Sequence, residues 1–69
     1  MKFEELKKTI VSDNECSFIR NNKKYLLYGW NQCDGYILTL EHNNEVLWQS
    51  EPKSRNNCIE EFEAYYSKL

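Results

Sequence analysis

The chain has 69 residues, of which 41% are hydrophobic and 14% aromatic, and its formal net charge is −2 at neutral pH. This length fits one small domain, and a content of two glycines and one proline argues against a disordered chain or a linker. The slightly acidic balance lacks the strong positive field on which non-specific nucleic-acid binding depends. We therefore expect a single folded domain over residues 1–69.

The first predicted element is a helix over residues 2 to about 11. Phe3, Leu6 and Ile10 recur at the spacing of one helix face, with Val11 beside them. The turn-forming residues 12–14 are expected to end this helix.

Four short strands are predicted next, over residues 16–20, 23–31, 36–42 and 45–50. Each pair of neighbouring strands is separated by residues that favour a two-residue hairpin turn. These turns are Asn21 with Asn22, Asp34 with Gly35, and Asn43 with Asn44. Pro52 is expected to end the pairing, because proline has no N–H to donate to a strand ladder.

A second helix is predicted from about Cys58 to Lys68, with Asn57 as its N-cap. One apolar stripe on it carries Ile59, Phe62, Tyr66 and Leu69. The fold class predicted is therefore α+β: a four-stranded antiparallel meander with an N-terminal and a C-terminal helix packed on one face, in the order α-β-β-β-β-α.

The two-residue turns fix a strand register, and the register divides the side chains between two faces of the sheet. One face is aliphatic and continuous, which assigns it to the core; it carries Cys16, Phe18, Tyr25, Leu27, Gly29, Leu38, Leu40 and Leu47. Gly29 leaves a gap there that Phe62 or Phe3 is expected to fill. The other face mixes aromatic and polar residues: Ser17, Ile19, Leu26, Tyr28, Trp30, Ile37, Thr39, Glu41, Val46, Trp48 and Ser50.

The aromatic and polar face is the predicted partner-binding surface. Exposed aromatic patches commonly mark protein interfaces, and we assign this role to Tyr28, Trp30 and Trp48, with Thr39 and Glu41 as polar neighbours. Three alternatives stay open: the aromatic residues serve only cross-strand packing, the helices cover the aromatic face instead, or a slipped register exchanges the faces of a strand.

Basic residues gather at two places, and they carry a second functional hypothesis. Arg20, Lys23 and Lys24 surround the first hairpin turn, while Lys53 and Arg55 precede the second helix. A helix, a meander and a helix with basic residues before the last element resemble the double-stranded-RNA-binding domain in outline. That resemblance implies nucleic-acid binding, and only Lys53 and Arg55 match the family's basic residues in position. The alternative hypothesis is a nucleic-acid-binding module that uses all five residues. The chain departs from that family in having four predicted strands where the family has three.

No catalytic constellation is found in the sequence. The three cysteines, Cys16, Cys33 and Cys58, and the single histidine, His42, form no CxxC pair and no four-ligand zinc pattern. Cys33, beside a predicted turn, is expected to be exposed, and His42 is expected to be a solvated turn residue. We therefore expect no enzyme activity, no metal and no cofactor.

We expect neither a membrane span nor a signal peptide in this chain. No apolar run approaches the ~20 residues needed to span a bilayer, and the start MKFEELKK has no apolar signal-peptide stretch. In its short, Asn- and Lys-rich character the chain is similar to small proteins of low-GC bacteria and their phages, among which are inhibitors and immunity proteins. We expect a small cytoplasmic binding or regulatory protein whose partner is another protein or a second copy of itself, and neither nucleic acid nor a membrane.

Overall fold

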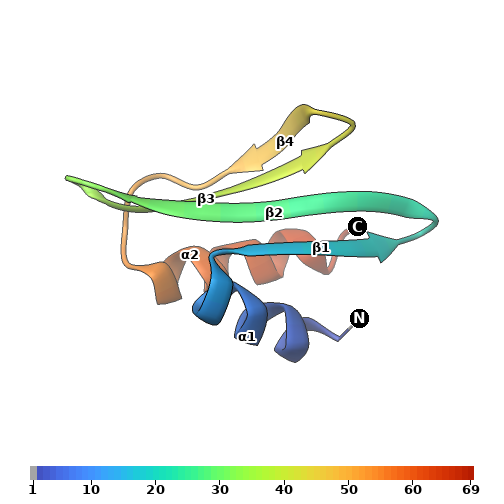
Figure 1. Cartoon of the computed structure of the whole chain (residues 1–69), viewed down its shortest axis with the longest axis horizontal. Coiled ribbons are helices and arrows are strands. Elements are labelled where there is room, and N and C mark those ends of the chain that lie inside the picture. Colours follow the sequence, from blue (N-terminus) through green and yellow to red (C-terminus); the bar gives the residue numbers. More distant parts are fainter. Residues whose placement is uncertain (1) are drawn as a thin grey trace.

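The computed structural model describes residues 2–69; Met1, which belongs to the predicted domain, lies outside the described residues. The elements in chain order are α1 (Phe3–Asp13), β1 (Glu15–Arg20), β2 (Lys23–Gln32), β3 (Gly35–His42), β4 (Glu45–Gln49) and α2 (Arg55–Tyr66). The strands form one antiparallel sheet in the order β1-β2-β3-β4. Both helices lie on the same side of this sheet (Figure 1). The predicted α+β architecture is confirmed.

The core lies between the helices and one face of the sheet, and alternation along the strands creates it. Every second residue of β1, β2 and β3 points toward the helices, and these residues are almost all apolar. The buried core consists of Leu6, Ile10, Cys16, Phe18, Tyr25, Leu27, Tyr36, Leu38, Leu40, Cys58, Ile59, Phe62 and Tyr66. Each helix supplies one apolar stripe to it, as the sequence predicts.

Asparagine shapes three of the connections. Asn21, Asn22, Asn43 and Asn44 all have positive φ, which matches the backbone twist that two-residue hairpins need. Asn14, with φ of 60°, ends α1 in the left-handed conformation, and its N–H donates to the carbonyl of Ile10. The sequence prediction of tight turns at both Asn–Asn pairs is confirmed.

The turn between β2 and β3 lies at a different position from the predicted one. It falls at residues 33–34, so that Asn31 lies opposite Tyr36, and Gly29 lies opposite Leu38. The predicted pairs, Asn31 with Leu38 and Gly29 with Leu40, are wrong by two residues. Because side chains alternate with a period of two, a shift of two residues leaves every side chain on its predicted face.

Two glycines beside this turn accommodate close neighbours. Gly35 has φ of 140°, and a Cβ there would lie 2.8 Å from the backbone nitrogen of Lys53, which bridges to Tyr36. The ring and hydroxyl of Tyr36 lie over Gly29, where a Cβ would overlap them. The Tyr36 hydroxyl donates to Asn14 Oδ1 at 2.9 Å. The gap at Gly29 is therefore filled from the neighbouring strand, and the expectation that Phe62 or Phe3 fills it is wrong.

The pairing of β3 with β4 is interrupted by a β-bulge. Glu41 lies opposite Val46, but Leu40 lies opposite Trp48, so Leu47 is an additional residue on β4. One extra residue exchanges the faces of everything beyond it. Trp48 therefore lies on the helix side, and the predicted pairing of Leu40 with Leu47 is wrong. Ser50 also lies on the helix side, buried, and its hydroxyl accepts a hydrogen bond from the N–H of Leu38 at 2.9 Å.

The second helix begins three residues earlier than predicted. Its N-cap is Ser54, whose hydroxyl accepts the N–H of Asn57 at 3.2 Å, and its first helical residue is Arg55. Both serine and asparagine are good N-caps, and the earlier start adds Arg55, Asn56 and Asn57 to the helix ahead of Cys58, which is fully buried. The predicted N-cap role of Asn57 is wrong.

Replacing the N-cap residue distinguishes the observed start of α2 from the predicted one. We expect Ser54→Ala to lower the free energy of unfolding by about 1 kcal/mol, because the first turn loses an acceptor. Asn57→Ala, the matched control, should change it by only a few tenths of a kcal/mol, since alanine is a good helix former. Urea denaturation followed by circular dichroism measures both. A larger loss for Asn57→Ala than for Ser54→Ala would contradict the observed boundary.

Replacing Gly29 tests its contact with Tyr36. We expect Gly29→Ala to destabilise the protein by about 1–3 kcal/mol, because the new Cβ forces the Tyr36 ring from its place. The same change made in a Tyr36→Ala background should cost almost nothing, so the two substitutions should be strongly non-additive. Additive free energies in a double-mutant cycle would show that the two side chains do not compete for space.

Candidate functional site

One face of the sheet carries no helix, and we call it the open face. The register places on it Glu15, Ser17 and Ile19 from β1, Lys24, Leu26, Tyr28 and Trp30 from β2, Ile37, Thr39 and Glu41 from β3, and Val46 and Gln49 from β4. In Figure 1 the helices lie below the sheet, and the β3–β4 hairpin rises on the side away from them. The confirmed placement of both helices on one side therefore leaves this second face uncovered.

A stacked aromatic pair lies on the β2 part of the open face, toward the β2–β3 turn. The rings of Tyr28 and Trp30 are 5.8 Å apart between centroids and inclined by 22°. Trp30 keeps 36% of its surface exposed, and Tyr28 is half-buried. The Tyr28 hydroxyl donates a hydrogen bond to the Glu41 carboxylate. Three of the predicted site residues are therefore brought together in one place.

The other two predicted site residues lie elsewhere. Thr39 is on the open face but is fully buried, and its hydroxyl accepts a hydrogen bond from Gln49 Nε2 at 2.9 Å. Trp48 lies on the helix side, because of the bulge, with its ring 5.2 Å from that of Phe62. The prediction that Trp48 shares a face with Trp30 is wrong, and Thr39 offers no surface to a partner.

Apolar side chains that the prediction did not choose are more exposed than those it did. Ile19 is 68% exposed, Val46 is 54% exposed, and Leu47 at the bulge is 40% exposed. Ile19 and Val46 stand at the two edges of the open face, on β1 and β4. The alternation of the strands already placed Ile19 and Val46 on this face, whereas the exposure of Leu47 depends on the bulge.

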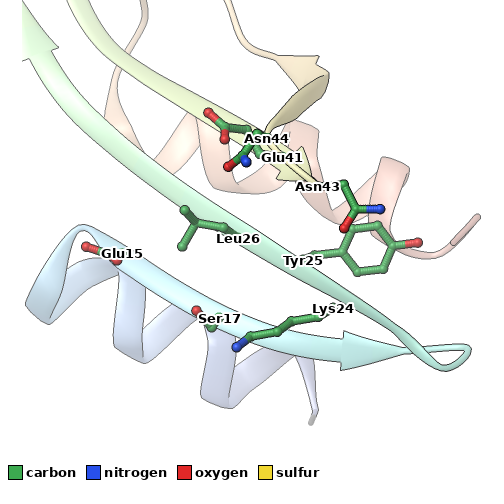
Figure 2. Close-up of a pocket in the computed structure, with 8 residues that line it drawn as sticks. All are labelled: Glu15, Ser17, Lys24, Tyr25, Leu26, Glu41, Asn43 and Asn44. Atoms are coloured by element: carbon green, nitrogen blue, oxygen red, sulfur yellow. The ribbon is translucent and has the colours of Figure 1, made fainter.

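Beside the aromatic pair, the open face is hollowed into a concavity of about 470 Å³. Figure 2 shows the side chains around it: Glu15, Ser17, Lys24, Tyr25, Leu26, Glu41, Asn43 and Asn44. Leu26 lies between the two carboxylates, Glu15 and Glu41, and Lys24 reaches along the sheet from one end. An apolar floor with charged and amide groups at its rim suits the contact of a polar side chain or peptide group.

The histidine and the buried cysteines have structural roles. His42 Nδ1 lies 2.9 Å from the carbonyl oxygen of Lys24, and since a carbonyl only accepts, the nitrogen is the donor. The Sγ of Cys58 lies 3.2 Å from the carbonyl oxygen of Tyr36 in the core. Burial raises the pKa of the Cys16 thiol, which keeps it protonated. His42 is therefore half-buried and engaged, contrary to the expectation of a solvated residue.

The exposed cysteine has the position that the sequence predicts. Cys33 lies in the β2–β3 turn and is exposed, while Cys16 and Cys58 are buried. Over residues 2–69, no three histidine, cysteine, aspartate or glutamate side chains are grouped so that they could hold a metal ion.

The basic residues of the second hypothesis divide between opposite ends of the molecule. Arg20, Lys23 and Lys24 lie at the β1–β2 turn, and Lys53 and Arg55 lie near the other end of the sheet (Figure 1). Several of these cations are already engaged.

The guanidinium of Arg20 lies 4.3 Å from the centroid of the Tyr66 ring. Lys53 forms a salt bridge with Glu61. Arg55 Nη1 donates to the carbonyl of Val11 at 3.2 Å. These geometries hold the cations against the protein's own surface, and they build no continuous basic stripe.

None of the helices described over residues 2–69 has the length and apolar character needed to cross a bilayer.

Comparison with protein-family models, with curated protein sequences and with solved structures finds no match to the chain. The geometry of the open face is therefore the basis on which we infer a function.

The hydrogen bond between Tyr28 and Glu41 has a measurable pH signature. Hydrogen bonding to the Glu41 carboxylate raises the pKa of Tyr28 above its ordinary value, with smaller contributions from burial and from the Glu41 charge. The stabilisation is fully present below about pH 10, the ordinary pKa of tyrosine, and is lost as the pH rises through the higher value of the folded state.

We expect Glu41→Gln to lower the pKa of Tyr28, because the charged acceptor is removed, and Glu45→Gln, the control, to leave it unchanged. A pH titration of the tyrosine ring carbons by NMR measures both. An identical Tyr28 titration in wild type and Glu41→Gln would contradict the hydrogen bond.

Proposed function

We propose that this protein is a small non-enzymatic binding or regulatory protein that uses the open face of its sheet to dock another protein. The observation that carries the proposal is the stacked Tyr28–Trp30 pair on a sheet face that no helix covers. A role in inhibiting or neutralising a larger partner, as in inhibitors and immunity proteins, fits the size of the chain.

The composition of the open face supports this function. Tyrosine and tryptophan are enriched at the energetic centres of protein interfaces, because they bury a large apolar area and lose little conformational freedom. Glu41 holds the Tyr28 hydroxyl, so the ring is oriented before a partner arrives. Ile19 and Val46 add exposed apolar area at the two edges. Together they make a surface with a rigid aromatic pair toward one end and exposed apolar side chains toward the other.

Substitutions on the two sides of the sheet test the proposal. We expect immobilised wild-type protein to retain a specific partner from an extract of its native cell, and Trp30→Ala to weaken the purified partner's binding at least about tenfold, as loss of an interface aromatic commonly does. Val11→Ala is the matched control, because Val11 is an exposed apolar residue on α1 (41% exposed) on the opposite side of the molecule. Isothermal titration calorimetry with the purified partner measures the three affinities.

The outcomes are decisive in both directions. A partner that binds wild type and Val11→Ala equally, and Trp30→Ala weakly, supports the open face as its site. A partner that binds Trp30→Ala as tightly as wild type would place the interaction elsewhere. The absence of any retained protein would count against a protein-binding function.

A further inference from the structure

The sheet has two edges, and they differ in their protection against another strand. β4 is five residues long, carries the bulge at Leu47, and is soon followed by Pro52, all features that discourage pairing at an edge. β1 is six residues long and has no bulge, no proline and no lysine. Three of its side chains, Glu15, Ser17 and Ile19, are exposed. The β1 edge is therefore the one open to strand addition.

The ladder between β1 and β2 tells which backbone groups of β1 point outward. Gly29 donates its N–H to the carbonyl of Asn14 at 2.9 Å, which marks this pair as hydrogen-bonded. Such pairs alternate along an antiparallel ladder, so Cys16 and Phe18 are also bonded to β2. The N–H and C=O groups of Glu15, Ser17 and Ile19 then point away from the sheet and lack a strand partner.

These outward groups are matched by a second copy of the same strand. In an antiparallel two-fold arrangement centred on Ser17, Ser17 lies opposite its own copy and Glu15 lies opposite Ile19. All outward N–H and C=O groups of these three residues are then paired. The open faces of both copies lie on the same side, because residues directly opposite each other share a face.

The charges at the two ends of β1 favour a second copy of the chain as the partner at this edge. Glu15 lies at the beginning of β1, and Ile19 lies near its end. Lys24, on β2, lies directly opposite Ile19 and on the same face of the sheet. In the two-fold arrangement Glu15 of the second copy lies on the other side of Ile19. Glu15 of one copy and Lys24 of the other are then two strand spacings apart, roughly 10 Å, a gap that these long side chains can close above Ile19.

We propose that two copies of this chain join through their β1 edges into a dimer with a continuous eight-stranded sheet. We call the line along which the two β1 strands pair the seam. Two Glu15–Lys24 ion pairs form across it, and each covers an Ile19 side chain that is 68% exposed in the single chain. α1 packs on the helix side of the sheet beneath β1 and β2, so it leaves the open-face side of the pairing edge uncovered. The dimer unites two open faces into one surface, and its existence does not depend on the partner-binding function.

Charge substitutions at the seam test the dimer. Sedimentation equilibrium of the wild-type protein up to roughly 1 mM is expected to show a dimer. Glu15→Lys or Lys24→Glu alone should raise its dissociation constant about tenfold, because each homodimer then faces two like-charged pairs. An equimolar mixture of the two variants should restore dimerisation, since every pair in the mixed dimer is again of opposite charge.

The controls lie outside the seam. Glu45→Lys on β4 and Trp30→Ala on the open face should dimerise as wild type does, which separates this proposal from partner binding. NMR spectra of each variant report whether it folds, and the mixing experiment compares the two charge variants with each other under identical conditions. A monomeric wild type, a dimer insensitive to both charge changes, or a mixture that stays monomeric would overturn the proposal.

Discussion

The constraint on which this structure depends is that one face of a four-stranded sheet must be covered, and the chain supplies two helices to cover it. Alternation along β1, β2 and β3 gathers the apolar residues on a single face. The stripe of α1 with Leu6 and Ile10, and that of α2 with Ile59 and Phe62, are both used on that face. Because both apolar stripes pack there, neither helix covers the other side, and the open face is a direct consequence of the hydrophobic packing.

The β-bulge in β4 then determines which side chains lie on the open face. The bulge at Leu47 turns the Trp48 ring toward Phe62 and leaves Leu47 partly exposed. The bulge also interrupts the β4 edge, which a regular strand would leave available for pairing. A single additional residue thus enlarges the aromatic core, removes one tryptophan from the open face, and makes the two edges of the sheet unequal.

The functional proposals use different parts of the same face. Tyr28, oriented by its bond to Glu41, and Trp30 lie toward the β2–β3 turn and suit a partner that packs over the sheet. Glu15 and Lys24 lie toward the β1 edge, where a second copy would add a strand. Since a strand added at β1 extends the sheet in its own plane, it would leave Tyr28 and Trp30 free to dock a partner.

The sequence by itself determined the element order, the tight asparagine turns, the two helix stripes and the faces of β1, β2 and β3. These follow from periodicity and local turn chemistry, and even the misplaced turn before Gly35 preserved the faces because it shifted the register by two. The position of Trp48, the burial of Thr39, the filling of the gap at Gly29 and the start of α2 were decided only by tertiary structure. Each of these features depends on which arrangement packs best against residues distant in the chain: the bulge at Leu47, the Tyr36 ring over Gly29, and the choice of Ser54 over Asn57 as N-cap. No local sequence pattern carries that information.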